Sequence, residues 1–130
     1  MTRKIQVALL GLGEVGQDFA EMFLERIQEG GRPVEIAAVA HRHPDSPVAL
    51  GFAQNGVPVF ADAVEVAGLG ERIDIIFDLT GNPEVRSRLR QALQASGNRH
   101  TVIAPEVVAQ LLWLFFSDED QAVERVGGYG

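Results

Sequence analysis

Three glycines at G-x-G-x-x-G spacing constrain this chain more than any other feature of its sequence. They follow an apolar run at residues 5–10 and precede a segment with helical hydrophobic spacing. Where a strand turns into a helix at such glycines, the first allows a tight turn, the second lets backbone N–H groups approach a pyrophosphate, and the third lets the helix pack against the strand. The motif predicts a dinucleotide-binding turn made of Gly11, Leu12, Gly13, Glu14, Val15 and Gly16. The alternative is a glycine-rich turn that binds nothing.

Length and composition place this motif in one folded domain. The chain has 130 residues, 46% of them hydrophobic and 22% charged, which suits a single globular domain. We expect residues 1–130 to form that domain, with residues 117–130 as a tail or a flap over it. Its 11 Lys and Arg against 18 Asp and Glu give a net charge of −7, which disfavours a nucleic-acid partner.

The same sequence predicts a cytoplasmic protein without a membrane segment. It contains no cysteine and no signal-like apolar stretch after Met1. The longest near-continuous apolar run, residues 107–116, is about half the length that a membrane-spanning helix needs.

Strand-like and helix-like segments alternate along the chain. The strong signals are a buried strand at 5–10, a helix with apolar positions from 15 to 27, strands at 34–40 and 73–79, a helix beginning at Pro83 with Asn82 as its cap, a strand at 100–104 and a last helix beginning at Pro105. Weaker signals give a loop from residue 41, a short helix at 48–53, an edge strand at 57–60 and a helical turn at 64–69. This order predicts an α/β fold, a doubly wound parallel sheet of Rossmann type.

Three segments in order carry a resemblance to a known family. They are Val7–Gly16, Asp78–Pro83 and Thr101–Ala104, and through them the chain resembles the NAD(P)-binding domain of homoserine dehydrogenases and related oxidoreductases. The resemblance covers most of the chain. It implies that Leu79, Thr80 and Gly81 pass beside the ribose and nicotinamide of the cofactor.

The resemblance also implies a difference at the reaction centre. In the family, the strand matching Thr101–Ala104 leads to an Asn-Lys pair, whereas this chain has Pro105-Glu106 there. The substrate-binding and dimerising domain of the family has no counterpart in these residues. Glu106 is a weak catalytic candidate, and its alternative role is a first-turn carboxylate that stabilises a helix N-terminus.

The residues after the second strand bear on the choice between NADP and NAD. A fold that selects NAD normally carries Asp or Glu there to bind the ribose 2′-hydroxyl, but this chain has His41, Arg42 and His43. Arg42, with help from either histidine, suits a 2′-phosphate, which favours NADP modestly over NAD. The alternative is that Arg42 only solvates a loop.

Other polar residues give weaker signals. His41 and His43 lack a third ligand nearby in sequence, so we predict no metal site. Asp74 and Asp78 lie four residues apart in one strand, a spacing that suits either paired acid–base carboxylates or two unrelated strand ends.

The last helix, residues 105–116, is apolar on nearly all sides. Because a sheet covers only one side of a helix, this pattern predicts a second covering surface, either another copy of the chain or a partner domain, centred on Trp113 and Phe116. The alternative is that residues 117–130 fold back over the helix.

Together these features predict an NAD(P)-binding domain of oxidoreductase type that binds the dinucleotide without complete catalysis by this chain alone. A non-catalytic nucleotide or redox sensor, read by a partner or an attached domain, is the main alternative. A degenerate module that serves only in assembly is a third. The sequence does not decide whether the chain is an enzyme.

Overall fold

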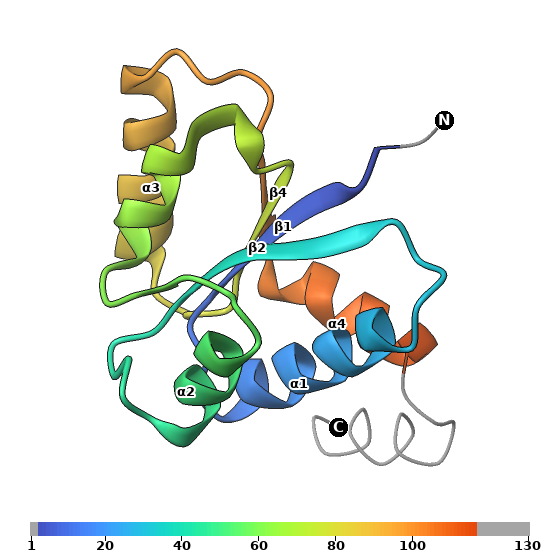
Figure 1. Cartoon of the computed structure of the whole chain (residues 1–130). Coiled ribbons are helices and arrows are strands. Elements are labelled where there is room, and N and C mark those ends of the chain that lie inside the picture. Colours follow the sequence, from blue (N-terminus) through green and yellow to red (C-terminus); the bar gives the residue numbers. More distant parts are fainter. Residues whose placement is uncertain (1–2, 117–130) are drawn as a thin grey trace.

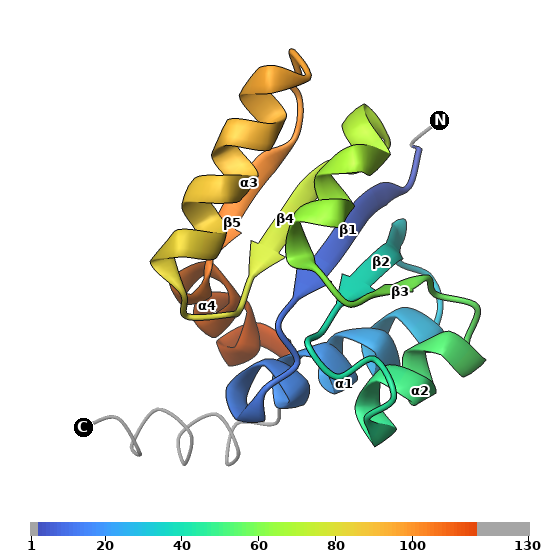
Figure 2. The same ribbon diagram turned by 90° about the vertical axis from the view of Figure 1, so that its left-hand side faces the viewer.

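A five-stranded parallel sheet forms the centre of the molecule (Figure 1), and its strands lie in the order β3-β2-β1-β4-β5 (Figure 2). The computed structural model describes residues 3–116. The strands are β1 (Ile5–Leu10), β2 (Val34–Ala40), β3 (Val59–Phe60), β4 (Ile75–Asp78) and β5 (Val102–Pro105), and the helices are α1 (Glu14–Gln28), α2 (Pro47–Gln54), the 3₁₀ segment η1 (Ala63–Arg72), α3 (Pro83–Ala95) and α4 (Glu106–Phe116). The predicted doubly wound, Rossmann-type fold is confirmed.

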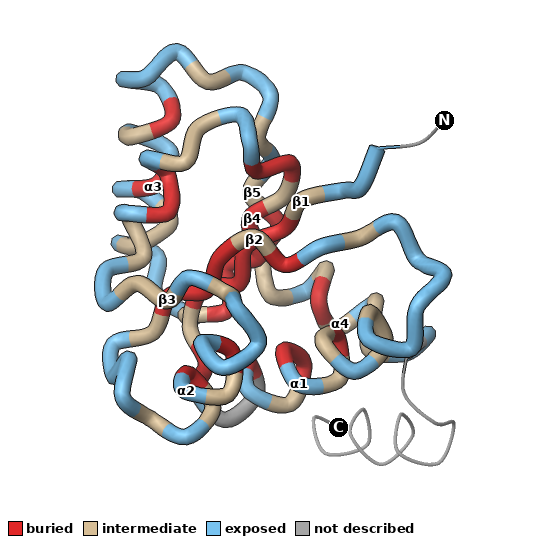
Figure 3. The backbone as a smooth tube through the Cα atoms, viewed as in Figure 1, coloured by how far each residue is buried: buried red, intermediate tan, exposed pale blue. Residues whose placement is uncertain are grey.

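Helices cover both faces of the sheet (Figures 1 and 2). One face packs against α1, α2 and α4, with Phe19, Phe23 and Phe77 among its buried residues. The other face packs against η1 and α3, where Val66 and Leu89 are buried. The most buried backbone follows the central strands (Figure 3).

β1 shows why its sequence is apolar without alternation. Val7 and Leu9 belong to the core on the α1 face, whereas Ala8 and Leu10 belong to the core on the α3 face. A central parallel strand is covered on both sides, so positions 7–10, which are buried, carry apolar side chains toward both faces.

Side chains cap the starts of two helices, and the cap of α3 was predicted. The side chain of Asn82 accepts a hydrogen bond from the Glu84 N–H at 2.9 Å, and Pro83 opens α3 as predicted. Ser46 accepts from the N–H of Ala49 and is followed by Pro47 at the start of α2. This cap turns the weakly predicted segment into a regular helix.

Two predicted boundaries were wrong. Pro105 ends β5 and Glu106 begins α4, because the strand pairing with β4 runs on to Asp78 and Pro105. The predicted helical turn at 64–69 is part of the longer 3₁₀ segment η1, which is interrupted at Gly70 with φ 65° and ψ −147°.

The arrangement leaves a crevice between the ends of β1 and β4. These strands are neighbours, yet the chain leaves β1 toward α1 on one face and leaves β4 toward α3 on the other. In open α/β sheets such a reversal is the usual position of a ligand site.

Candidate functional site

The turn after β1 is shaped by two glycines that lie close to other backbone atoms. Gly11 has φ +87°, and a Cβ built on it would lie 2.9 Å from the backbone N and Cα of Thr80. A Cβ at Gly16 would overlap the carbonyl oxygen of Gly11 and lie 3.3 Å from the Leu79 Cβ. Both positions therefore need glycine for the turn, the helix and the β4 end to fit together.

Gly13 differs from them because there is free space where its side chain would be. It precedes α1 with extended backbone, φ −73° and ψ −171°, and a Cβ there would meet no atom within 4 Å. The N-cap residue of α1 is this glycine, which makes no side-chain hydrogen bond to the first backbone N–H groups of the helix. The side chains of Glu14 and Val15 lie outside the described part.

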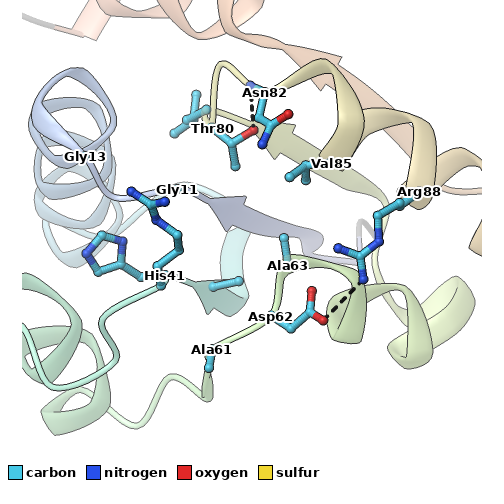
Figure 4. Close-up of a pocket in the computed structure, with 13 residues that line it drawn as sticks. Gly11, Gly13, His41, Ala61, Asp62, Ala63, Thr80, Asn82, Val85 and Arg88 are labelled. Carbon is cyan, nitrogen blue, oxygen red and sulfur yellow. Dashed lines mark hydrogen bonds and ion pairs between the residues drawn. The ribbon is translucent and has the colours of Figure 1, made fainter.

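A cavity of about 420 Å³ opens at this turn (Figure 4). It lies over the carboxyl ends of β1, β2, β3 and β4 and reaches the first turns of α3. Its lining comprises Gly11, Gly13, Ala40, His41, Arg42, Ala61, Asp62, Ala63, Leu79, Thr80, Asn82, Val85 and Arg88.

Six of the predicted site residues meet in this cavity. They are Gly11, Gly13, His41, Arg42, Leu79 and Thr80. Leu12 and Gly16 support the turn without lining the cavity, and Gly81 and Glu106 lie beside it: a Cβ at Gly81 would lie 3.9 Å from Glu106 Oε2. Glu106 is the first residue of α4, and its carboxyl group lies close to the turn between β4 and α3.

His41 contacts the glycine turn directly. Its Nδ1 accepts a hydrogen bond from the N–H of Leu12 at 3.3 Å. Burial lowers the pKa of His41, and the neighbouring charges of His43 and Arg42 lower it further. His41 is thus a neutral acceptor in this structure, and Arg42 is the exposed cation at the end of β2.

A buried carboxylate organises the opposite wall. Asp78 accepts hydrogen bonds from the N–H and the hydroxyl of Thr80 and from Nε of Arg86. The Thr80 hydroxyl also accepts from the N–H of Asn82 (Figure 4). This hydroxyl therefore both donates and accepts a hydrogen bond within the turn.

Sequence reasoning missed the far end of the cavity. Asp62 and Arg88 form an ion pair there at 3.4 Å, with Val85 beside them (Figure 4). The helical pattern placed Arg86 and Arg88 on an outward face, which gave no sign of these contacts.

Asp74 and Asp78 lie at opposite ends of β4 and do not form a catalytic pair. Asp74 binds Arg3, the N–H of Gln6 and His100 at the amino end of the strands. Its hydrogen bonds with Arg3, Gln6 and His100, the one with Arg3 above all, hold the pKa of Asp74 far below its ordinary range.

Two kinds of feature are absent from residues 3–116. No group of three or more His, Cys, Asp or Glu side chains is placed to hold a metal ion there. Among these same residues, no helix has the length and apolar character to cross a membrane.

Comparison with known proteins gives matches to dehydrogenases. No family model matches the chain. It is 34% identical over 84 residues to acetaldehyde dehydrogenase 4 of Azotobacter vinelandii, a match that covers 62% of this chain and 25% of that protein. Its fold is similar to homoserine dehydrogenase of S. aureus, with TM-score 0.58 and 27% identity over 94% of this chain in the pH 6.5 crystal structure, and TM-score 0.59 and 26% identity over 95% in the pH 7.5 structure.

The predicted resemblance to homoserine dehydrogenases is confirmed by this likeness. The chain spans only 30% of the length of that enzyme and 25% of the acetaldehyde dehydrogenase. The likeness is thus to one part of each relative.

Proposed function

We propose that this chain is a dinucleotide-binding domain of oxidoreductase type that takes NADP or NAD in the cavity beside α1. The observation that carries the proposal is the open position of Gly13 at the uncapped start of α1, on the wall of a cavity at the sheet reversal. The matches to two dehydrogenases support the same class of function.

The pyrophosphate fits over the backbone of residues 12–15. The first N–H groups of α1 and the positive end of its dipole meet there, and both favour a bound anion. Because Gly13 has no side chain, a phosphate can approach this backbone closely.

The cavity wall at β2 favours NADP modestly over NAD. Arg42 is exposed there, no acidic side chain follows β2 directly, and a guanidinium forms charge-assisted hydrogen bonds with a phosphate. His41 is already engaged with Leu12, so Arg42 is the main candidate for a 2′-phosphate contact.

We propose further that this chain does not complete hydride transfer alone. The end of β5 carries Pro105 and Glu106 where the resembling family has an Asn-Lys pair, so the local charge is reversed. Glu106 stays a weak catalytic candidate beside Gly81. The same substitution favours the alternative, a nucleotide or redox sensor whose ligand state is read by a partner or an attached domain.

Residues 1–130 are proposed as a single domain of a cytoplasmic protein with an apolar contact surface on α4. One side of α4 packs in the core through Val108, Ala109, Leu112 and Trp113. The other side exposes Val107, Leu111, Leu114 and Phe115. We propose that this exposed face contacts a second copy of the chain or a partner domain. Trp113 is not part of that face, because it packs against the core. The side chain of Phe116 and the predicted flap at 117–130 lie outside the described residues.

Calorimetric titration of the purified protein with NADPH, NADP, NADH and NAD tests the proposal. We expect saturable binding, tighter for the two phosphorylated forms. A folded protein that binds none of the four nucleotides overturns it. Turnover with a carbonyl or alcohol substrate by this chain alone would reject the part that excludes complete catalysis.

A further inference from the structure

The backbone pairing between β1 and β2 is extended at its carboxyl end by a side chain. The N–H of Gly11 donates to the carbonyl of Ala40 at 2.8 Å. The next N–H, that of Leu12, has no strand carbonyl opposite it and donates to Nδ1 of His41 at 3.3 Å. Since Leu12 is only 2% exposed, its N–H has little access to water and needs this acceptor.

The bond requires the neutral imidazole. An Nδ1 that accepts a hydrogen bond carries no proton, so the ring proton sits on Nε2. The surroundings favour this state: burial and the positive neighbours His43 and Arg42 lower the pKa of His41. The rings of His41 and His43 pack edge to face, with centroids 5.8 Å apart.

Other charged groups lie in the same cavity or in the same loop as His41. Asp62 follows β3, and Arg88 from α3 pairs with it across the same cavity. Asp45 is in the loop that carries His41. Within residues 3–116, no carboxylate forms a hydrogen bond or an ion pair with His41.

We propose that His41 is a positioning residue of the phosphate-binding turn: its neutral ring holds the Leu12 N–H, and protonation of the ring releases the turn and weakens dinucleotide binding. This inference rests on the proposed function. His41 acts on the ligand through Leu12: by holding the Leu12 N–H it fixes the backbone that follows, and the N–H groups of residues 13–15 must point at the pyrophosphate together.

Protonation has two opposed effects on an anionic ligand. It adds a positive charge to the cavity wall, and it places an N–H donor against the Leu12 N–H donor. The second effect dominates in this arrangement, because the anion site uses the backbone of the turn and Arg42 already supplies a cation. Only the neutral form is then competent to bind, so affinity should fall by about tenfold per pH unit below the pKa of the ring.

A pH titration of the ligand-free protein tests the hydrogen bond between Leu12 and His41 without relying on any nucleotide. Ring ¹⁵N shifts of His41 and the amide resonance of Leu12 are followed by NMR from pH 8 to pH 4.5. We expect an unprotonated Nδ1 at neutral pH and one shared midpoint for both residues. Separate midpoints, or a protonated Nδ1 at neutral pH, overturn the inference whatever the nucleotide results.

Binding of NAD is then measured over the same pH range for the wild type, His41→Asn, His41→Leu and His43→Asn. NAD is the probe because the 2′-phosphate of NADP itself titrates near pH 6, a value typical of phosphate esters. His41→Asn offers an amide oxygen that accepts but does not titrate, so we expect near wild-type affinity at pH 7.5 without the loss in acid. His41→Leu should bind more weakly at every pH.

His43→Asn serves as the matched control in the same loop. It should keep the loss in acid with a midpoint moved to higher pH, because one cause of the lowered pKa of His41 is removed. Parallel profiles for the wild type and His41→Asn overturn the inference, as does an affinity that rises in acid. Circular dichroism at each pH confirms that the protein stays folded, which separates release of the turn from unfolding.

Discussion

The carboxylate of Asp78 accepts hydrogen bonds from both the N–H and the hydroxyl of Thr80, at 3.1 and 2.6 Å. Asp78 is fully buried, and its second oxygen accepts from Arg86 Nε at 3.1 Å. The turn between β4 and α3 is therefore held by hydrogen bonds to a buried carboxyl group.

Replacing Asp78 should destabilise the protein more than an ordinary surface change. Asp78→Ala leaves the Thr80 donors and the half-buried Arg86 without their acceptor, and we expect a loss of about 2 to 4 kcal/mol in the free energy of unfolding. Urea denaturation measures it. Glu84→Ala, on the exposed first turn of α3, is the control and should change stability little; equal effects of both changes would remove the special role of Asp78.

Gly13 and Gly16 should fail in different ways. Gly13→Val meets open space, so the variant should fold normally and lose nucleotide binding because its side chain fills the phosphate position. Gly51→Val is a matched control, since its Cβ also meets nothing within 4 Å and it lies in α2 away from the cavity lining. Calorimetric titration with NADPH compares the affinities of the two variants. An unaltered affinity in folded Gly13→Val would exclude this placement of the pyrophosphate.

Gly16→Ala, in contrast, should damage the fold itself. Its Cβ would overlap the Gly11 carbonyl oxygen, a backbone atom that cannot move without opening the turn. We expect destabilisation of about 3 kcal/mol or more in thermal or urea unfolding. A variant as stable as the wild type would show that α1 can shift away from the turn.

The sequence was most informative where local chemistry decides the structure. The limits of β1 and β2, the Asn82 cap and the glycine turn follow from apolar runs, capping side chains and φ preferences, all of which act within a few residues. Pro105 was misplaced because its position depends on pairing with β4, which no local pattern contains.

The same distinction between local features and contacts of distant residues applies to the candidate site. The glycine turn was predictable from spacing alone. The bond from Leu12 to His41 and the pairing of Asp62 with Arg88 join residues 29 and 26 positions apart in the chain, so they depend on how β2, η1 and α3 are placed around the cavity. In the sequence, an arginine on the outward face of a helix has the same spacing whether its side chain contacts solvent or a carboxylate.

Arg42→Ala should weaken NADP binding more than NAD binding. If the guanidinium contacts the 2′-phosphate, the difference should be about 1 to 3 kcal/mol, the range for hydrogen bonds to charged groups. Arg90→Ala, an exposed change on α3 outside the cavity lining, controls for net charge. Calorimetric titration with both nucleotides checks the prediction, and equal losses for NADP and NAD would reject the 2′-phosphate role of Arg42.

Asp74 should contribute stability that depends on pH. Its folded-state pKa is depressed far below the ordinary value, so its contribution is present above about pH 4, the ordinary range of a carboxyl group, and is lost as pH falls toward the folded-state pKa. Asp74→Asn should melt at a lower temperature at pH 7, with the gap to the wild type narrowing below pH 4. Asp45→Asn, in an exposed loop, should show no such gap; a constant gap for Asp74→Asn at all pH values would contradict the assignment.

The exposed face of α4 should drive association. Phe115 is 78% exposed and Leu111 is 54% exposed. We expect the wild type to sediment as a dimer at high concentration and Leu111→Asp with Phe115→Asp to sediment as a folded monomer. Trp113→Asp should instead reduce stability, because Trp113 packs on the core.

Leu50→Asp controls for the loss of an exposed apolar side chain elsewhere, on α2. A wild type that stays monomeric would leave the α4 face to an attached or separate partner domain. If Leu50→Asp also dissociated the dimer, the contact would not be centred on α4.

Both outer strands of the sheet are short and carry proline. β3 has 2 residues and follows Pro58, and β5 has 4 residues and ends at Pro105. An unpaired strand edge can recruit a strand from another molecule, but a proline supplies no N–H, and so few residues allow only a few intermolecular hydrogen bonds. The sheet is consequently protected against edge-to-edge aggregation, and its growth in that direction would require a strand long enough to reach past these prolines.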